Sequence, residues 1–131
     1  MNKVFVAVYG SLRSGMENHS ININAGAKSL GNGFTDENYR LSRYGKAYFP
    51  VVSLKKEDSV SPIRVEVFET DEAGLTGPYD RLEGYPSFYN RTEVPITLDS
   101  GDKVTAWIYH IDDIRCHGDN VEDGDWVQFK K

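Results

Sequence analysis

The stretch Val4–Arg13 reads Val-Phe-Val-Ala-Val-Tyr-Gly-Ser-Leu-Arg. Its first part is β-branched and aromatic with almost no polar residue, which is typical of a strand buried on both faces of a sheet. The strand is expected to run from Val4 to Tyr9 and to stop at Gly10, where a polar loop begins. A buried strand at this place predicts a fold built on a sheet, with a loop at the carboxyl end of a central strand.

Outward from this strand, the pattern predicts mostly short strands. Alternation of apolar and polar residues makes Ile63–Phe68 a half-exposed strand, and the turn Asp99–Asp102 joins the two longest strands as a hairpin. A short helical turn is expected at Ser20–Asn24, and the tail from Asp112 is expected to be loop-like. The remaining strands are predicted at Leu30–Phe34, Tyr39–Tyr44, Phe49–Leu54, Asn90–Leu98 and Lys103–Ile111.

One region, Asp71–Leu82, has the pattern of a helix. Leu75, Tyr79 and Leu82 fall on one side of it, while Gly77-Pro78 is expected to reset the helix and Gly84 to end it just after Glu83. Many strands with one good helix predict an α+β architecture or a small barrel, formed by a single domain over residues 1–131.

Composition limits the function classes. The chain has 131 residues, a hydrophobic fraction of 39% and a net charge of -5, without a basic block, so a nucleic-acid partner is not expected. No apolar stretch is long enough to cross a bilayer. The N-terminal apolar run is too short for a signal peptide, and the single cysteine, Cys116, suits a reducing compartment. We therefore expect a cytoplasmic protein with no membrane partner.

The loop Gly10–Arg13 is the first candidate for chemistry. Backbone N–H groups after a central strand can bind a carboxylate or an oxyanion, and Ser11 and Arg13 add a hydroxyl and a positive charge. The loop matches neither the Walker pattern nor a nucleophile elbow. An ordinary tight turn remains the alternative.

Glu83 is the second candidate. The negative end of the helix dipole and the aromatic residues that follow (Tyr85, Phe88 and Tyr89) are expected to raise the pKa of this carboxyl group. A glutamate of this kind takes up and returns a proton near neutral pH. A salt bridge from Glu83 to Arg81 or Arg91 would have the opposite effect, and the sequence leaves both open.

Two metal-site patterns in the tail are rejected. His110, Cys116 and His117 match no zinc spacing, and Asp119–Gly124 lacks oxygen ligands where a calcium loop requires them.

Taken together, these stretches resemble the gamma-glutamylcyclotransferase-like superfamily. Val8–Arg13 resembles its opening signature, and Leu82–Pro86 with Tyr89 and Arg91 resembles the signature that carries its acidic residue. The order of the intervening strands, the late strand Ala106–Tyr109 and the ending Gly124–Trp126 are also similar to small bacterial members. The likeness covers nearly the whole chain.

The resemblance implies a small mixed parallel and antiparallel β-barrel with flanking short helices, without a metal or organic cofactor. It implies an enzyme that releases 5-oxoproline from a gamma-glutamyl amino acid or amine. Glu83 would be its general acid/base, and substrate would contact Tyr9, Gly10, Ser11, Leu12, Arg13 and Tyr89. A monomer or weak dimer is expected.

This sequence departs from the family pattern at Val65, where many members have glycine, which predicts a different pocket wall. His19 is expected to anchor the first loop rather than to act in catalysis. Two other functions remain open: a catalytically silent ligand-binding or regulatory module on the same fold, and hydrolysis of a related amide.

Overall fold

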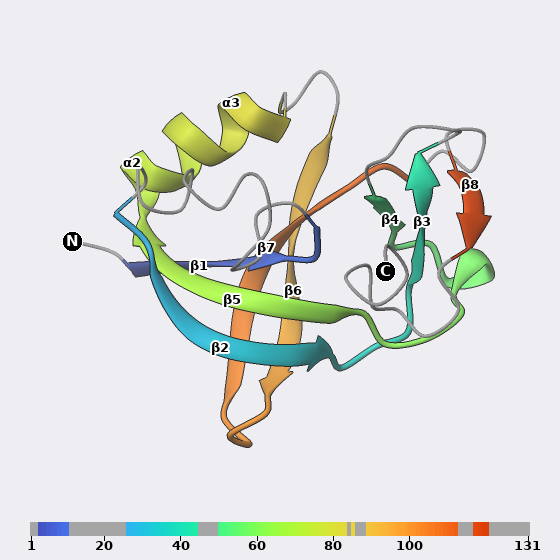
Figure 1. Cartoon of the computed structure of the whole chain (residues 1–131), viewed down its shortest axis with the longest axis horizontal. Coiled ribbons are helices and arrows are strands. Elements are labelled where there is room, and N and C mark those ends of the chain that lie inside the picture. Colours follow the sequence, from blue (N-terminus) through green and yellow to red (C-terminus); the bar gives the residue numbers. More distant parts are fainter. Residues whose placement is uncertain are drawn as a thin grey trace.

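The computed structural model describes residues 3–10, 26–44, 50–83, 85, 89–112 and 117–120. Figure 1 shows a barrel with a helical segment on one side and a smaller sheet beside it. The elements in chain order are β1 (Lys3–Val8), β2 (Lys28–Thr35), β3 (Arg40–Tyr44), β4 (Pro50–Ser53), η1 (Lys56–Asp58), β5 (Arg64–Asp71), α2 (Glu72–Gly74), η2 (Leu75–Tyr79), α3 (Asp80–Glu83), β6 (Asn90–Leu98), β7 (Lys103–His110) and β8 (His117–Asn120).

The barrel is closed and its strand order is β1-β5-β2-β6-β7. Neighbouring strands are antiparallel, except that β1 and β7 pair in parallel and complete the ring. Closure leaves no unpaired strand edge around the ring. The predicted α+β fold with a small mixed barrel is therefore confirmed. Its interior is filled by alternate side chains of the strands, including Ala7, Val65, Val67, Val94, Ile96, Ala106 and Ile108.

β1 is buried on both faces over its second half, as the sequence predicts. Ala7 belongs to the interior cluster, whereas Val6 and Val8 belong to a second cluster on the outer face, beneath the helical segment. The strand lies between β5 and β7, so neither face nor edge is open. This position brings Tyr9 and Gly10, which follow β1, to one end of the barrel.

The strand predicted at Ile63–Phe68 is confirmed as β5, but the prediction that it is half-exposed is wrong. In β5, Val65 and Val67 are buried in the barrel interior, and Phe68 is buried in the outer cluster. Glu66 is only 6% exposed. Period-2 alternation describes a strand with one wet face, but here the helical segment covers the other face.

Gly33 allows β2 and β6 to approach closely. A Cβ atom at this position would lie 2.5 Å from the carbonyl oxygen of Thr97 and 2.9 Å from Cα of Leu98. Both are backbone atoms, so a side chain would have to push the strands apart. Gly33 lies opposite Val65 in the register of β2 with β5, and the Val65 side chain fills the adjacent interior.

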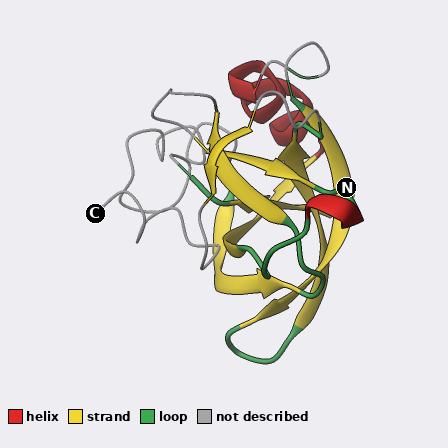
Figure 2. Ribbon diagram, turned by 90° about the vertical axis from the view of Figure 1, so that its right-hand side faces the viewer, coloured by secondary structure: helices red, strands yellow, loops and turns green. Residues whose placement is uncertain are grey.

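The helical segment runs continuously through α2, η2 and α3 and lies along one side of the barrel (Figures 1 and 2). The Asp71 carboxylate accepts a hydrogen bond from the Gly74 N–H at 2.9 Å and caps its N-terminus. Around Pro78 the winding widens to a π turn, in which the Asp80 N–H donates to the Leu75 carbonyl. The expected reset is thus a local change of winding within one helical segment.

Beside the barrel, the smaller sheet has the order β4-β3-β8 and is antiparallel. β8 lies in the tail that the sequence predicts as loop, and that prediction is wrong for His117–Asn120. The hairpin turn at Asp99–Asp102 is confirmed, with the Leu98 N–H donating to the Asp102 carbonyl at 2.8 Å. The helical turn expected at Ser20–Asn24 lies outside the described residues.

Candidate active site

The predicted site residues fall on three parts of the chain. Tyr9 and Gly10 directly follow β1, Glu83 is the last residue of α3, and Tyr89 directly precedes β6. Ser11, Leu12 and Arg13 lie outside the described residues, as does the side chain of Glu83. The structure therefore describes the elements that carry these residues and the side chains that contact those elements.

Tyr109 of β7 links the first loop to the helix that carries Glu83. The Tyr9 hydroxyl donates to the Tyr109 carbonyl at 2.7 Å, and the Tyr109 hydroxyl donates to Asp80 Oδ1 at 2.5 Å. Asp80 is the first residue of α3 and Glu83 the last. The two motifs that the sequence singles out are thus anchored to one buried residue, Tyr109, which is 2% exposed.

Arg91 of β6 completes this arrangement. Its Nε and Nη2 donate to the two oxygens of Asp80 at 3.0 and 3.3 Å. The guanidinium lies against two aromatic rings, 4.3 Å from the centroid of Tyr85 and 4.5 Å from that of Trp107. Both charged side chains are nearly buried, with 13% of Arg91 and 11% of Asp80 exposed. In this structure Arg91 is therefore a partner of Asp80.

The pKa of Arg91 reflects this pairing. Burial alone would lower the pKa of the guanidinium, but the hydrogen bonds and the negative charge of Asp80 outweigh it and raise the pKa. Asp80 is the counterion of Arg91 and accepts its two hydrogen bonds in a bidentate geometry. We name Asp80, Arg91 and Tyr109 the outer network, because it lies between the barrel and the helical segment.

Tyr89 is buried, and its hydroxyl donates to the Pro50 carbonyl at 2.7 Å. Tyr9 is likewise buried, at 6% exposed. Both rings stand at the ends of strands next to the predicted loop and helix, and each has its hydroxyl bonded to a backbone carbonyl. If Tyr9 and Tyr89 bind substrate, they would therefore contact it with their ring faces. This role stays a prediction.

Glu66 is a buried carboxylate that sequence reasoning missed. The Ser29 hydroxyl donates to its Oε2 at 2.7 Å. Glu66 lies near Tyr79, whose pKa is raised first by burial of its own phenol and second by the charge of Glu66.

Val65, for which a changed pocket wall is predicted, points into the barrel interior instead of sharing the face of Glu66. The effect of Val65 on a substrate stays a prediction.

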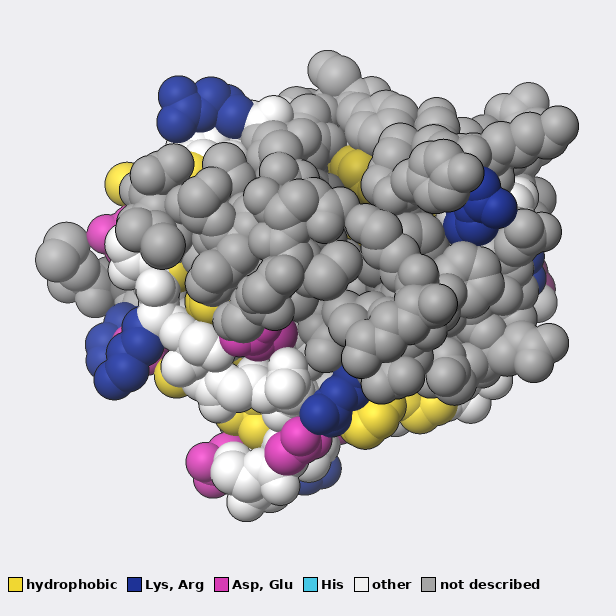
Figure 3. Space-filling model, viewed as in Figure 1, with side chains coloured by type: hydrophobic (Ala, Val, Ile, Leu, Met, Phe, Trp, Pro, Cys, Tyr) yellow, Lys and Arg dark blue, Asp and Glu magenta, His cyan; other side chains and the backbone are white. Residues whose placement is uncertain are grey.

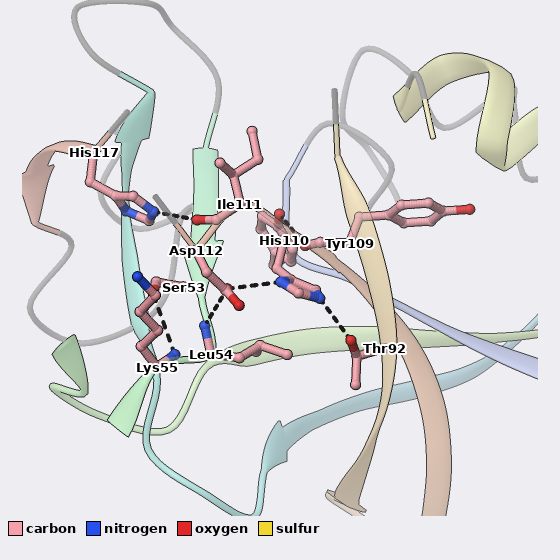
Figure 4. A network of polar contacts seen from close by, with 10 residues as sticks. Ser53, Leu54, Lys55, Thr92, Tyr109, His110, Ile111, Asp112 and His117 are labelled. Atoms are coloured by element: carbon pink, nitrogen blue, oxygen red, sulfur yellow. Dashed lines mark hydrogen bonds and ion pairs between the residues drawn. The ribbon is translucent and has the colours of Figure 1, made fainter. Parts of the chain in front are cut away.

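His110 forms a second polar network, which joins the barrel to the smaller sheet (Figure 4). Its Nε2 lies 2.8 Å from Thr92 Oγ1, and its Nδ1 lies 2.8 Å from Asp112 Oδ1. The same carboxylate oxygen accepts the Leu54 N–H at 2.9 Å. A ring that donates from Nδ1 to Asp112 and accepts at Nε2 from Thr92 satisfies both of its contacts. We name Thr92, His110 and Asp112 the inner network.

His117 belongs to the same joint, since its Nε2 lies 2.7 Å from the Ile111 carbonyl. The Ile111 N–H in turn donates to the Val52 carbonyl. Within the part of the chain that the structure describes, no three His, Cys, Asp or Glu side chains come close enough to hold a metal ion. Cys116 lies outside that part.

Comparison with known proteins places the chain in a family. A model of the family "Gamma-glutamyl cyclotransferase, AIG2-like" matches residues 6–128. The Methanocaldococcus jannaschii protein MJ1514, provisionally named a gamma-glutamylcyclotransferase, is 38% identical over 127 residues, which cover 96% of this chain and 98% of the relative. The chain belongs to the AIG2-like gamma-glutamyl cyclotransferase family.

Two further relatives support this family assignment. The Drosophila melanogaster protein CG2811, with the same provisional name, is 33% identical over 109 residues, covering 81% of this chain and 68% of the relative. The crystal structure of the mouse AIG2-like protein matches with a TM-score of 0.74 and 27% identity, over 85% of this chain and 78% of the mouse chain. The fold is therefore that of the family.

On the face in Figure 3, the described Lys and Arg side chains are scattered, with Asp and Glu beside several of them. Among the described residues, Lys3 pairs with Glu69 at 2.9 Å and Arg64 with Asp99 at 2.7 Å. The prediction that the protein has no nucleic-acid partner remains untested. As for the membrane, none of the helices among the described residues has the length and apolar character that a span requires.

Proposed function

We propose that this protein is a gamma-glutamylcyclotransferase that releases 5-oxoproline from a gamma-glutamyl amino acid or gamma-glutamyl amine, with Glu83 as general acid/base. Family membership supports the class of reaction. The observation that carries the site is the double anchoring of Tyr109, whose carbonyl binds Tyr9 and whose hydroxyl binds Asp80 of α3. It joins Tyr9, which directly follows β1, and α3, which ends at Glu83, to the same strand.

In the proposed reaction, Glu83 removes a proton from the α-ammonium group of the substrate. The free amine then attacks the γ-carbonyl carbon of the same molecule, forming the new C–N bond of a five-membered ring. Collapse of the tetrahedral intermediate breaks the bond to the leaving amine, which takes the proton back from Glu83. The ring nitrogen then loses its second proton to Glu83, which passes it to the released amine, so that the amine leaves as an ammonium ion. One carboxyl group thus serves every proton transfer, and no water or second substrate is consumed.

The remaining acceleration is proposed to come from binding. Backbone N–H groups of residues 10–12 would hold the substrate's α-carboxylate or the developing oxyanion. The rings of Tyr9 and Tyr89 would wall the substrate, and Arg13 would add a positive charge. The amine and its carbonyl already share one molecule, so the gain from binding is the freezing of the rotatable bonds between them in the geometry of attack.

A product analysis tests the proposal. The purified protein is incubated with a panel of gamma-glutamyl amino acids and gamma-glutamyl amines, and the products are identified by mass spectrometry. The proposal predicts 5-oxoproline and the free amine in equal amounts from at least one member of the panel. Free glutamate in place of 5-oxoproline would show hydrolysis, and binding without any product would show a silent ligand-binding module. Either result would overturn the proposal.

The proposal extends to the cellular setting. We propose a cytoplasmic enzyme that works on small molecules without a metal or organic cofactor, as a monomer or weak dimer. Activity that survives dialysis against a chelator would support this, together with a solution mass that is that of a monomer or that rises toward a dimer only at high protein concentration.

A further inference from the structure

The inner network joins a hydroxyl, an imidazole and a carboxylate by two hydrogen bonds in series (Figure 4). The Thr92 hydroxyl lies 2.8 Å from Nε2 of His110, and Nδ1 of the same ring lies 2.8 Å from Asp112 Oδ1. In this order the three groups can turn a side-chain oxygen into a nucleophile, because the ring takes its proton and the carboxylate orients the ring. The arrangement is recognised by its geometry, since it recurs on unrelated folds with different orders along the chain.

The burial of the three side chains suits these parts. Thr92 is exposed on β6, so this end of the network faces solvent. His110 is only 6% exposed and is bonded at both ring nitrogens. The Asp112 carboxylate is held in turn by the Leu54 N–H, which donates to the same oxygen at 2.9 Å. An exposed hydroxyl is therefore backed by a base whose orientation is fixed.

The backbone beside Thr92 supplies a donor for an oxyanion. The Asp36 N–H donates to the Pro95 carbonyl, so Pro95 presents its backbone polar groups to the edge of β6 that faces β2. Because these directions alternate along an antiparallel strand, Glu93 presents its N–H to the same edge. In the described part of the chain the register of β2 with β6 ends at Ile96. The amide that directly follows the nucleophile is also the oxyanion donor of the nucleophile-elbow enzymes.

We propose that Thr92, His110 and Asp112 form a second reactive site, which hydrolyses small esters through an acyl group carried on Thr92. Side chains two apart on a strand share a face, so Thr92 and His110 lie on the face of Val94 and Ile108, which fill the barrel interior. The helical segment covers the opposite face. The site is thus separate from that of the proposed function and does not depend on it.

In the first half of the reaction, the Thr92 oxygen attacks the carbonyl carbon of the ester and its proton passes to Nε2 of His110. The carbonyl oxygen becomes an oxyanion, which the Glu93 N–H binds. The bond from this carbon to the leaving oxygen then breaks, and the leaving oxygen takes the proton from Nε2. An alcohol departs and the acyl group stays on Thr92.

In the second half, water attacks the acyl-threonine and gives its proton to Nε2. The bond from the acyl carbon to the Thr92 oxygen breaks, and that oxygen takes the proton back, so a carboxylic acid and the free hydroxyl result. Asp112 holds the ring in place and stabilises its positive charge while the proton is on Nε2. One ester and one water give one acid and one alcohol.

The test uses the full chain with p-nitrophenyl acetate. Release of p-nitrophenolate is followed by absorbance, and acetylated residues are located by peptide mass spectrometry. We expect acetyl on Thr92, formed at least about 100-fold faster than on Thr105. Thr105 is the internal control, because it is an exposed threonine of the adjacent strand β7 whose hydroxyl bonds to none of the described side chains. If water removes the acetyl group quickly, p-nitrophenolate release should instead continue beyond one equivalent of protein.

Variants separate the three parts. Thr92→Val should abolish the acetylation and the continued release, and Thr92→Ser should retain both. His110→Gln should slow the reaction at Thr92 at least about 100-fold. Asp112→Asn keeps an oxygen for the Leu54 N–H but not the charge, and should slow it at least about 10-fold, with Asp112→Glu recovering part of the loss. A contact that only joined the two sheets would change the melting temperature of Asp112→Asn without changing this rate in the folded protein.

Circular dichroism shows which variants are folded at the assay temperature. If His110→Gln is not folded, Thr92→Val and Asp112→Asn decide the question, because both leave the ring in place. Acetylation of Thr92 at the rate of Thr105 would overturn the inference, and so would a rate at Thr92 that Asp112→Asn leaves unchanged. Release of p-nitrophenolate that is the same in Thr92→Val as in wild type, with no acetyl on Thr92, would also overturn it.

Discussion

The outer and inner networks use neighbouring residues of the same two strands. Arg91 and Tyr109 belong to the outer network, and the residues next to them, Thr92 and His110, belong to the inner one. Successive side chains of a strand point to opposite faces. One face of the β6–β7 hairpin therefore holds the helix of Glu83, and the other face holds the smaller sheet.

The two networks also differ in their chemistry. The outer one is a nearly buried ion pair with a phenol, whereas the inner one consists of a hydroxyl, an imidazole and a carboxylate that is 35% exposed. A one-residue step along either strand thus separates contacts to α3, the helix that ends at Glu83, from contacts that join the barrel to the smaller sheet. Substitutions at neighbouring positions should therefore separate activity from stability.

The largest effect on stability is expected for Arg91→Ala. The variant leaves the Asp80 carboxylate nearly buried without its counterion, and breaking a buried pair in this way costs about 3 to 5 kcal/mol. Urea unfolding at pH 7, followed by circular dichroism, measures the loss. A change below about 1 kcal/mol would mean that water reaches Asp80 and that the outer network is no tighter than a surface pair.

His110→Ala should come next and affect stability rather than the release of 5-oxoproline. It removes two hydrogen bonds and leaves a void at the joint between the sheets, at a cost of about 2 to 3 kcal/mol. At a temperature where the variant is fully folded, turnover should stay within about 2-fold of wild type. A larger loss of turnover would erase the distinction between the two networks.

Tyr109→Phe and Thr92→Val form a matched pair of single hydroxyl deletions. The phenol donates to a charged, buried carboxylate, so its loss should cost about 1.5 to 2 kcal/mol. Thr92 is exposed and its hydroxyl bonds the His110 ring next to water, so its loss should cost less than about 1 kcal/mol. Equal free energies of unfolding for the two variants would contradict the ranking of the networks by burial.

The smallest effect on stability is expected for a substitution of Asp99. Arg64 donates two hydrogen bonds of 2.7 Å to Asp99, the same bidentate chemistry as in the outer network but at the surface. These hydrogen bonds lower the pKa of Asp99. The resulting stabilisation is present above the ordinary carboxyl pKa of about 4 and disappears as the pH falls through the lowered pKa in the folded state.

Asp99→Asn should accordingly lower the melting temperature slightly at pH 7 and by less at pH 2.5. Differential scanning calorimetry at the two pH values measures this. A pH-independent difference would assign the effect of Asp99 to the turn geometry rather than to its charge.

Much of the fold could be predicted from local pattern. The β-branched run before Gly10, the hairpin turn at Asp99–Asp102 and the apolar stripe through Leu75 and Tyr79 each carry their own signal in the sequence. β8 does not, because His-Gly-Asp-Asn has no strand propensity and its pairing with β3 imposes the conformation. The burial of Glu66 likewise depends on a helix that covers it from outside the strand.

The candidate site was predictable only in part. Glu83 and the loop after Tyr9 stand out because a helix end and a strand end have recognisable neighbours in sequence. Asp80 gives no such signal, since its partners Arg91 and Tyr109 are 11 and 29 residues away. Only the register of β6 with β7 and the docking of α3 determine which of several charged residues become a pair. Long-range pairing of this kind is decided by tertiary structure.

The substitution Glu83→Gln tests the central claim most directly, measured as the rate of 5-oxoproline release beside the melting temperature. Glu93→Gln, an exposed position on β6, is the matched control and should keep full activity. The account predicts that Glu83→Gln lowers turnover at least about 100-fold, as expected for loss of a general acid/base, while the melting temperature stays close to that of wild type. Turnover of Glu83→Gln near the wild-type level, with the protein folded, would contradict it.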